Sequence, residues 1–246
     1  MESKLVLTRR SVLAGSAAGA AGVAALAATG TVKISAALQQ LSAGEGPIPL
    51  AVVMDNNATM IDFAGPWEVF QDASVVDVPG FSIFTVAAGP GPYQTTGNVV
   101  GNRMTGLKFT PDYSFADAPQ PKVVLMGAQA GRGDPAKLAW IRAAAENADI
   151  VMSVCTGAFL LAGTGLIDGL SATTHHDFFD SFEKQFPRVK LVRGTRFVDN
   201  GKFMSAGGLT SGIDAALHVV QRYYGPAIAQ QVADYMEYQS AGWRVA

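Results

Sequence analysis

The sequence predicts an α/β protein, a doubly wound and mostly parallel sheet with helices on both faces. Short apolar runs such as residues 49–54 and 122–126 have the continuous hydrophobicity of strands that are buried on both sides. These runs alternate with segments of helical length, as in parallel sheets whose connections cross over the faces. The alternation is regular from residue 47 onward, without an internal repeat, so one domain is expected over residues 47–246.

The individual elements follow from the apolar runs and their punctuation. Pro66 and Pro226 stand where a helix can begin, and Asp134 is placed to cap a third helix. Strands are expected at residues 49–54, 81–88, 122–126, 149–154, 189–192, 197–198 and 203–205, with a hairpin or edge region at 99–110. Helices are expected at residues 65–72, 135–147, 156–163, 177–186, 208–224 and 226–238.

The charge balance argues against a nucleic-acid partner. Charged residues make up 15% of the chain and the formal net charge is -2, whereas a DNA reader needs a basic face to neutralise phosphates. The composition therefore gives no reason to expect nucleic-acid binding, and the partner that we expect is a small-molecule substrate. No spacing typical of metal ligands is present, so neither a metal nor a cofactor is predicted.

The first thirty residues have the pattern of an export signal. Arg9 and Arg10 precede an Ala- and Gly-rich apolar run, as in a twin-arginine (Tat) signal peptide. We expect a signal peptide over residues 1–30, a linker over 31–46, and a periplasmic or secreted protein with no stable membrane anchor after cleavage. An uncleaved anchor is the alternative, although a run so poor in leucine inserts weakly.

Cys155 is the only cysteine, so it cannot form an internal disulfide. It is a buried filler, an intermolecular bridge or a reactive thiol. A buried strand (149–154) runs into a helix at Cys155 with no intervening loop, and the small Gly157 and Ala158 follow. This pattern predicts a nucleophile elbow with cysteine in place of serine. The helix start and the backbone N–H of Thr156 are expected to favour a thiolate and to face developing negative charge.

Four stretches carry a resemblance to a known family. They are residues 61–70 (IDFAGPWEVF), 154–162 (VCTGAFLLA), 165–175 with its GLIDG and ATTH segments, and 205–217 (SAGGLTSGIDAAL). In this order they resemble the ThiJ/PfpI family of the class I glutamine amidotransferase-like superfamily, and especially its isonitrile hydratase-like members and the sensor domains of certain AraC-type regulators. The resemblance implies a flavodoxin-like fold, and dimers are common in the family, so a homodimer is possible.

The resemblance also implies partners for Cys155. Asp62 matches the acidic residue that approaches the cysteine sulfur, where it can hydrogen-bond a thiolate when protonated or act as a base when ionised. Otherwise it is an acid that satisfies a helix N-terminus. His175 is placed near the thiol, but a Cys–His–Asp triad is not assigned.

The loop at Gly127 and Ala128 is expected beside the elbow, as are the residues around Gly65. In the family this loop is usually Gly-Gly, so Ala128 puts a left-handed turn and a full oxyanion hole in question.

Three functions are compatible with this pattern. The resemblance implies an isonitrile hydratase-like enzyme, a hydro-lyase in which Cys155 attacks the isonitrile carbon while Asp62 and Thr156 manage protons. A non-catalytic domain that senses a ligand or an oxidant is the first alternative. Hydrolysis of an amide or peptide by the same nucleophile is the second.

Overall fold

The structure is a computed structural model that describes residues 40–100 and 103–244, with side chains omitted for 98–105. The predicted signal peptide and most of the predicted linker lie outside the described residues. Residues 40–46 form neither helix nor strand, and the Leu41 N–H donates to the Arg222 carbonyl at 2.8 Å. Within the described part, no helix is both long and apolar enough to cross a bilayer.

The central sheet has the predicted α/β character. Among the described residues it contains seven strands in the order β12-β13-β9-β8-β1-β2-β7, and every pairing except β12–β13 is parallel. β8 and β9 are buried along their whole length, as their apolar sequences require. The strands are β1 (Ile48–Val53), β2 (Phe81–Ala87), β7 (Tyr113–Ser114), β8 (Val123–Met126), β9 (Ile150–Val154), β12 (Phe197–Asp199) and β13 (Phe203–Ala206).

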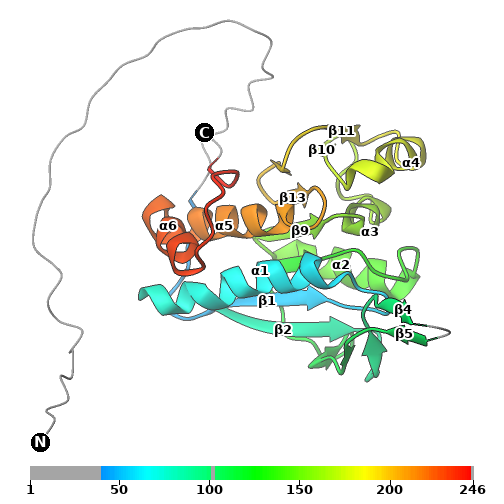
Figure 1. The fold of residues 1–246 in the computed structure, drawn as a ribbon, viewed down its shortest axis with the longest axis horizontal. Helices are drawn as coiled ribbons and strands as arrows, with labels where there is room; N and C mark the ends of the chain where they lie inside the picture. Colours follow the sequence, from blue (N-terminus) through cyan, green and yellow to red (C-terminus); the bar gives the residue numbers. More distant parts are fainter. Residues whose placement is uncertain (1–39, 101–102, 245–246) are drawn as a thin grey trace, which may run out of the picture. The chain divides into compact units, whose positions relative to one another are not determined.

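Helices cover both faces of this sheet (Figure 1). One core lies between the sheet and α1 (Met60–Asp72), α5 (Ser211–Tyr224) and α6 (Pro226–Tyr235). The other lies between the sheet and α2 (Pro135–Asn147), α3 (Gly157–Gly163) and α4 (Phe179–Gln185). Alternate residues of β1 enter opposite cores, Leu50 one and Ala51 the other, which is the two-residue period of a strand.

The remaining elements are short. Three two-strand pieces lie outside the main sheet: β3 (Tyr93–Gln94) with β6 (Lys108–Phe109), β4 (Asn98–Val100) with β5 (Arg103–Thr105), and β10 (Ser171–Ala172) with β11 (Lys190–Leu191). The β4–β5 pair is the hairpin expected within residues 99–110. Two 3-10 turns, η1 (Ala73–Val76) and η2 (His176–Phe178), complete the set.

Two helix starts differ from the prediction by three residues or more. α1 begins at Met60 rather than at residue 65, so Pro66 lies inside the helix and Asp62 lies in its first turn. A Cβ on Gly212 would lie 3.1 Å from the Pro66 ring, and one on Gly65 would lie 2.9 Å from Ile213. This close packing of α1 on α5 keeps the helix continuous through the proline. From the sequence alone, the same proline predicts a helix start. α5 begins at Ser211 instead of residue 208.

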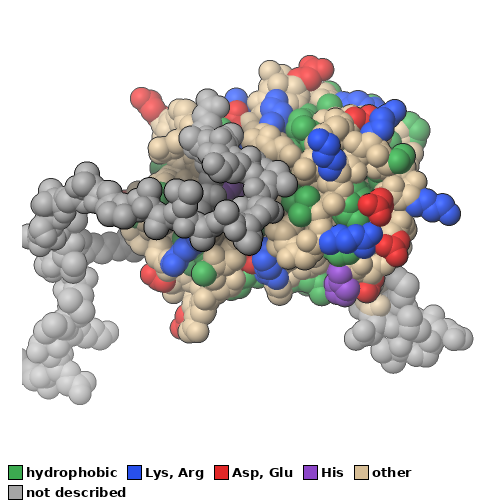
Figure 2. Space-filling view, turned by 90° about the horizontal axis from the view of Figure 1, so that it is seen from above, with side chains coloured by type: hydrophobic (Ala, Val, Ile, Leu, Met, Phe, Trp, Pro, Cys, Tyr) green, Lys and Arg blue, Asp and Glu red, His purple; other side chains and the backbone are tan. Residues whose placement is uncertain are grey.

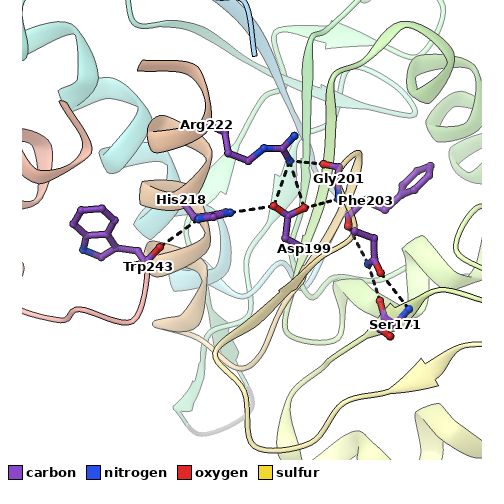
Figure 3. A network of polar contacts seen from close by, with 8 residues as sticks. Ser171, Asp199, Gly201, Phe203, His218, Arg222 and Trp243 are labelled. Carbon is purple, nitrogen blue, oxygen red and sulfur yellow. Dashed lines mark hydrogen bonds and ion pairs between the residues drawn. The ribbon is translucent and has the colours of Figure 1, made fainter. Parts of the chain in front are cut away.

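A buried polar network ties α5 to the β12–β13 hairpin and to the C-terminal segment (Figure 3). The His218 ring lies between the Asp199 carboxylate, at 3.0 Å, and the Trp243 carbonyl, at 3.3 Å. Arg222 bonds the same carboxylate and the Gly201 carbonyl. His218 is fully buried, so its role is in packing and satisfying these partners.

Charged side chains of both signs are interspersed on the face seen in Figure 2, with apolar side chains between them. That face carries no continuous basic field of the kind that binds phosphate backbones.

We expect Gly157→Ala to lower the free energy of unfolding sharply, by about 3 kcal/mol or more, because its Cβ would collide with the carbonyl of Met126 on β8. Chemical denaturation of purified variants measures the change. Gly163→Ala is the matched control in the same helix, since its Cβ would sit 3.5 Å from Leu138 in ordinary contact. A control as unstable as Gly157→Ala would contradict the steric argument.

Candidate active site

The site lies where the order of the strands in the sheet reverses. From β1 the chain moves outward to β2, and it later returns to β8 on the other side of β1. The connections that follow β1 and β8 therefore diverge, which leaves a crevice at the carboxyl ends of these strands. Asp62 follows β1, Gly127 and Ala128 follow β8, and Cys155 follows the adjacent β9.

Cys155 occupies a strained turn between β9 and α3. Its φ is 59°, in the left-handed region that side-chain-bearing residues rarely adopt. The strain is held by hydrogen bonds: its N–H donates to the Gly207 carbonyl at 2.8 Å, and its carbonyl accepts from the Thr174 hydroxyl at 2.9 Å. The elbow expected from the sequence is thus present, and Gly157 makes the close contact with the end of β8 that keeps it sharp.

Two backbone N–H groups and one carboxyl group surround the Cys155 sulfur. The N–H groups of Thr156 and Leu209 point to the sulfur and lower the pKa of the thiol. Burial and the negative charge of Asp62 act in the opposite direction and prevail, raising the pKa of Cys155 to about 12. The N–H groups therefore favour the thiolate, but desolvation outweighs the two hydrogen bonds.

Asp62 is a fully buried carboxyl group that faces the thiol. Its Oδ2 accepts the Ala128 N–H at 3.0 Å. Its Oδ1 has no hydrogen-bond partner of ordinary geometry within the part of the chain that the structure describes. Burial raises the pKa of Asp62 from 3.8 to about 6, against the lowering effects of Ala128 and Cys155.

The pair can move a proton at neutral pH. Above about pH 6 the Asp62 carboxylate lies beside a protonated thiol, which is the arrangement of a general base and its nucleophile. In this arrangement the Asp62 carboxylate could accept the thiol proton if the sulfur attacked an electrophile.

The loop after β8 is anchored by a buried ion pair. The Lys137 ammonium, which is fully buried, lies 2.6 Å from Asp55 and donates to the Ala130 carbonyl at 2.8 Å. Gly131 takes the left-handed turn (φ 66°), and a Cβ there would lie 2.6 Å from Asp55. The left-handed residue of this loop is thus Gly131, and Ala128 fits at its own position and presents its N–H to Asp62.

His175 packs on Gly208, the neighbour of Leu209, whose N–H points to the Cys155 sulfur. Its Nδ1 accepts the Asp177 N–H at 3.2 Å, and its ring packs so closely on Gly208 that a Cβ there would collide with it. No described contact joins His175 to the Cys155 sulfur, whose polar neighbours are Asp62 and the N–H groups of Thr156 and Leu209. Of the other predicted residues, Gly65 faces Ile213 of α5. Gly127 packs so closely on Asp62 that a Cβ there would clash with it.

One group of side chains in the described chain could hold a metal ion. Ligand atoms of His175, His176 and Asp177 lie within 4.8 Å of one another. The Asp177 carboxylate lies 3.2 Å from His176 and 3.7 Å from His175. Asp177 is 68% exposed, so these residues form a solvated surface cluster.

Three contributors were not singled out from the sequence. Leu209 supplies an N–H to the sulfur, Thr174 bonds the Cys155 carbonyl, and Lys137 holds the loop that carries Ala128. Leu209 and Thr174 lie inside stretches that carried the family resemblance, so the signal was present without a role attached. Lys137 looks like an ordinary surface lysine near a helix start, and only the structure shows it to be buried.

Comparison with known proteins agrees with this geometry. The model of the DJ-1/PfpI family matches residues 50–222, which is more than half of the chain. The chain belongs to the DJ-1/PfpI family. Among solved structures, a ThiJ/PfpI family protein from Pseudomonas syringae superposes with a TM-score of 0.68 at 23% identity, covering 81% of this chain and 78% of that one. An AraC family transcriptional regulator from Pseudomonas putida gives 0.67 at 16% identity, covering 77% of this chain and 100% of that one.

Curated relatives in the DJ-1/PfpI family include both enzymes and regulators. Isonitrile hydratase of Pseudomonas putida is 37% identical over 142 residues, which is 56% of this chain and 60% of that protein. The HTH-type transcriptional regulator CdhR of Pseudomonas aeruginosa is 33% identical over 100 residues, which is 41% of this chain and 30% of the regulator. The matched region thus spans less than two thirds of either relative.

Asp62→Asn should stabilise the protein at neutral pH but not in acid. The pKa of Asp62 is about 6 in the folded protein, above its ordinary value of 3.8. The stability that the protonated carboxyl contributes is therefore fully present below pH 3.8. It is lost as the pH rises through about 6. The variant avoids that loss, which is about 3 kcal/mol for a shift of this size. Denaturant melts at about pH 4.5 and about pH 7.5 test this window, with Glu68→Gln as an exposed control on the same helix. An equal effect of Asp62→Asn at both pH values would contradict it.

The alkylation rate of Cys155 should rise with pH around the pKa of Asp62, about 6, rather than around that of an ordinary thiol. The carboxylate formed there accepts the thiol proton as sulfur attacks. Iodoacetamide labelling followed by intact mass gives the rate, because the chain has one cysteine. In Asp62→Asn the rate at about pH 7 should fall by about tenfold or more. A wild-type midpoint above about pH 8 would show that Asp62 is not the base.

Proposed function

We propose that this protein hydrates an isonitrile to an N-substituted formamide through a covalent adduct on Cys155. The observation that supports this most directly is the buried Asp62 carboxyl, which takes the Ala128 N–H on one oxygen and faces a protonated thiol on a nucleophile elbow. The 37% identity to an isonitrile hydratase supports the choice of substrate.

The chemistry uses one proton and one water. The Cys155 sulfur bonds to the terminal carbon of R–N≡C while Asp62 accepts the thiol proton and returns it to that carbon, which gives the thioimidate R–N=CH–S–Cys155. Water then adds to the same carbon, and its protons go to nitrogen and, by way of Asp62, to the departing sulfur. The C–S bond breaks, leaving R–NH–CHO and the free thiol.

The surrounding groups fit these roles. The N–H groups of Thr156 and Leu209 stabilise negative charge on the sulfur as it attacks and leaves. The Asp62 carboxyl beside the sulfur is an acceptor for the attacking water once the thiol is bonded to carbon. The Ala128 N–H keeps the other carboxyl oxygen in place, so the base does not need to reorganise between steps.

A second candidate is a domain that senses a ligand or an oxidant. Its support is the match to a transcriptional regulator and the likeness to an AraC family regulator. Mild peroxide followed by peptide mass spectrometry separates the two. Sulfenic or sulfinic acid confined to Cys155, in a protein without hydratase activity, would favour the sensor.

We also propose that the protein is exported by the Tat route, from Arg9 and Arg10 before the apolar run. Fractionation of cells that express the full chain should place it in the periplasm. Replacement of both arginines by lysine should retain it in the cytoplasm at full length. An unchanged distribution would contradict the proposal, and a Lys33→Arg variant controls for exchange between lysine and arginine outside the pair.

Cys155→Ala should abolish formamide production from cyclohexyl isonitrile, and Asp62→Asn should lower kcat/KM by about a hundredfold through loss of the base. Gas chromatography of the product measures both. Glu68→Gln, an exposed change on α1, serves as the control. Turnover that survives in Cys155→Ala would exclude the covalent mechanism, and an inactive wild type would exclude the substrate.

A further inference from the structure

We infer that the side chains of Leu209 and Phe178 form an apolar subsite that receives the substituent R of the substrate attacked by Cys155. The substrate class would then be isonitriles with a bulky apolar R group, in preference to small or polar ones. The identity of the substrate as an isonitrile rests on the proposed function. The subsite itself can be tested without turnover, by the alkylation of the Cys155 thiol.

Leu209 contacts the Cys155 sulfur through its backbone and has an exposed apolar side chain. Its backbone N–H points to the Cys155 sulfur, while its side chain leaves the residue 43% exposed. A substrate carbon bonded to the sulfur therefore lies within one residue of this side chain. Any substituent that projects outward from that carbon passes the rim that Leu209 forms.

The backbone of Leu209 adds a second observation. Its φ is 53°, in the left-handed region, where glycine or asparagine would be relaxed and a bulky residue is strained. Strain of this kind persists where surrounding structure holds it, and it concentrates at functional sites. Leucine at this position is thus costly in the free protein and adds apolar surface at the mouth of the site.

Phe178 continues the same surface. The Phe178 ring packs edge-on against His175 at 5.9 Å, and His175 lies directly on Gly208, the neighbour of Leu209. Phe178 is 40% exposed, and its ring also meets Phe159 at 6.3 Å, so its inner edge is fixed while its outer face is open. Phe178 is thus linked through the His175 ring to Gly208, and Gly208 is followed by Leu209, whose N–H meets the sulfur.

Single exposed apolar side chains are common and carry no message by themselves. Val75 is as exposed, at 52%, but it lies in η1 beyond the C-terminal end of α1, with no described link to Cys155. Leu209 and Phe178 differ from such residues. The backbone N–H of Leu209 points to the sulfur. The Phe178 ring is linked to the neighbouring Gly208 through the His175 ring. Val75 therefore provides the matched control.

The test uses Leu209→Asn, which keeps the backbone N–H, suits the left-handed conformation and removes the apolar side chain. The readout is the kcat/KM ratio for cyclohexyl over methyl isonitrile, and it should fall about tenfold relative to the wild type. Phe178→Ser should lower the ratio in the same direction, and Val75→Asn should leave it unchanged.

A second readout does not depend on turnover. The rates at which N-cyclohexylmaleimide and N-methylmaleimide alkylate the one cysteine give the same ratio for the thiol site. A wild type that turns over neither isonitrile would end the proposed function, while the maleimide ratio still decides the subsite. Ratios in Leu209→Asn equal to the wild type, or lowered as much by Val75→Asn, would overturn the inference.

Discussion

The left-handed backbone of Cys155 is the constraint on which the site depends, because a strand can turn into a helix without a loop only through such a conformation. Two features make it possible. Gly157 lets α3 pass against the end of β8, and the Cys155 N–H bonds to the carbonyl of Gly207 on the far side. The sulfur is thereby fixed at the end of β9, next to the crevice at the carboxyl ends of β1 and β8.

Burial decides the protonation of the pair in this crevice. Asp62 has one good hydrogen bond, from Ala128, and the thiol receives two N–H groups, yet the pKa of both groups is raised. Desolvation of a charge in an apolar surrounding exceeds what a few hydrogen bonds return. A resident thiolate is therefore not the starting state, and reactivity comes from a carboxylate that is ready to take the proton.

Fold and family leave the function open between two classes. Both a hydratase and transcriptional regulators match this chain, and the likeness to solved structures below 25% identity concerns the fold alone. The distinction must come from the site, where the Cys155 thiol, the buried Asp62 carboxyl and two N–H donors converge.

The sequence by itself determined the sheet and the elbow. The buried strands are runs of adjacent apolar residues, and the Cys-Thr-Gly-Ala turn is also formed by adjacent residues. Both can therefore be predicted from short stretches of sequence. The pairing of Asp62 with the thiol followed from resemblance. The tertiary structure alone decided that α1 passes through Pro66, that Leu209 donates to the sulfur, and that burial raises the pKa of Cys155. Each of these depends on contacts between segments far apart in the chain, whose desolvation and packing no local pattern encodes.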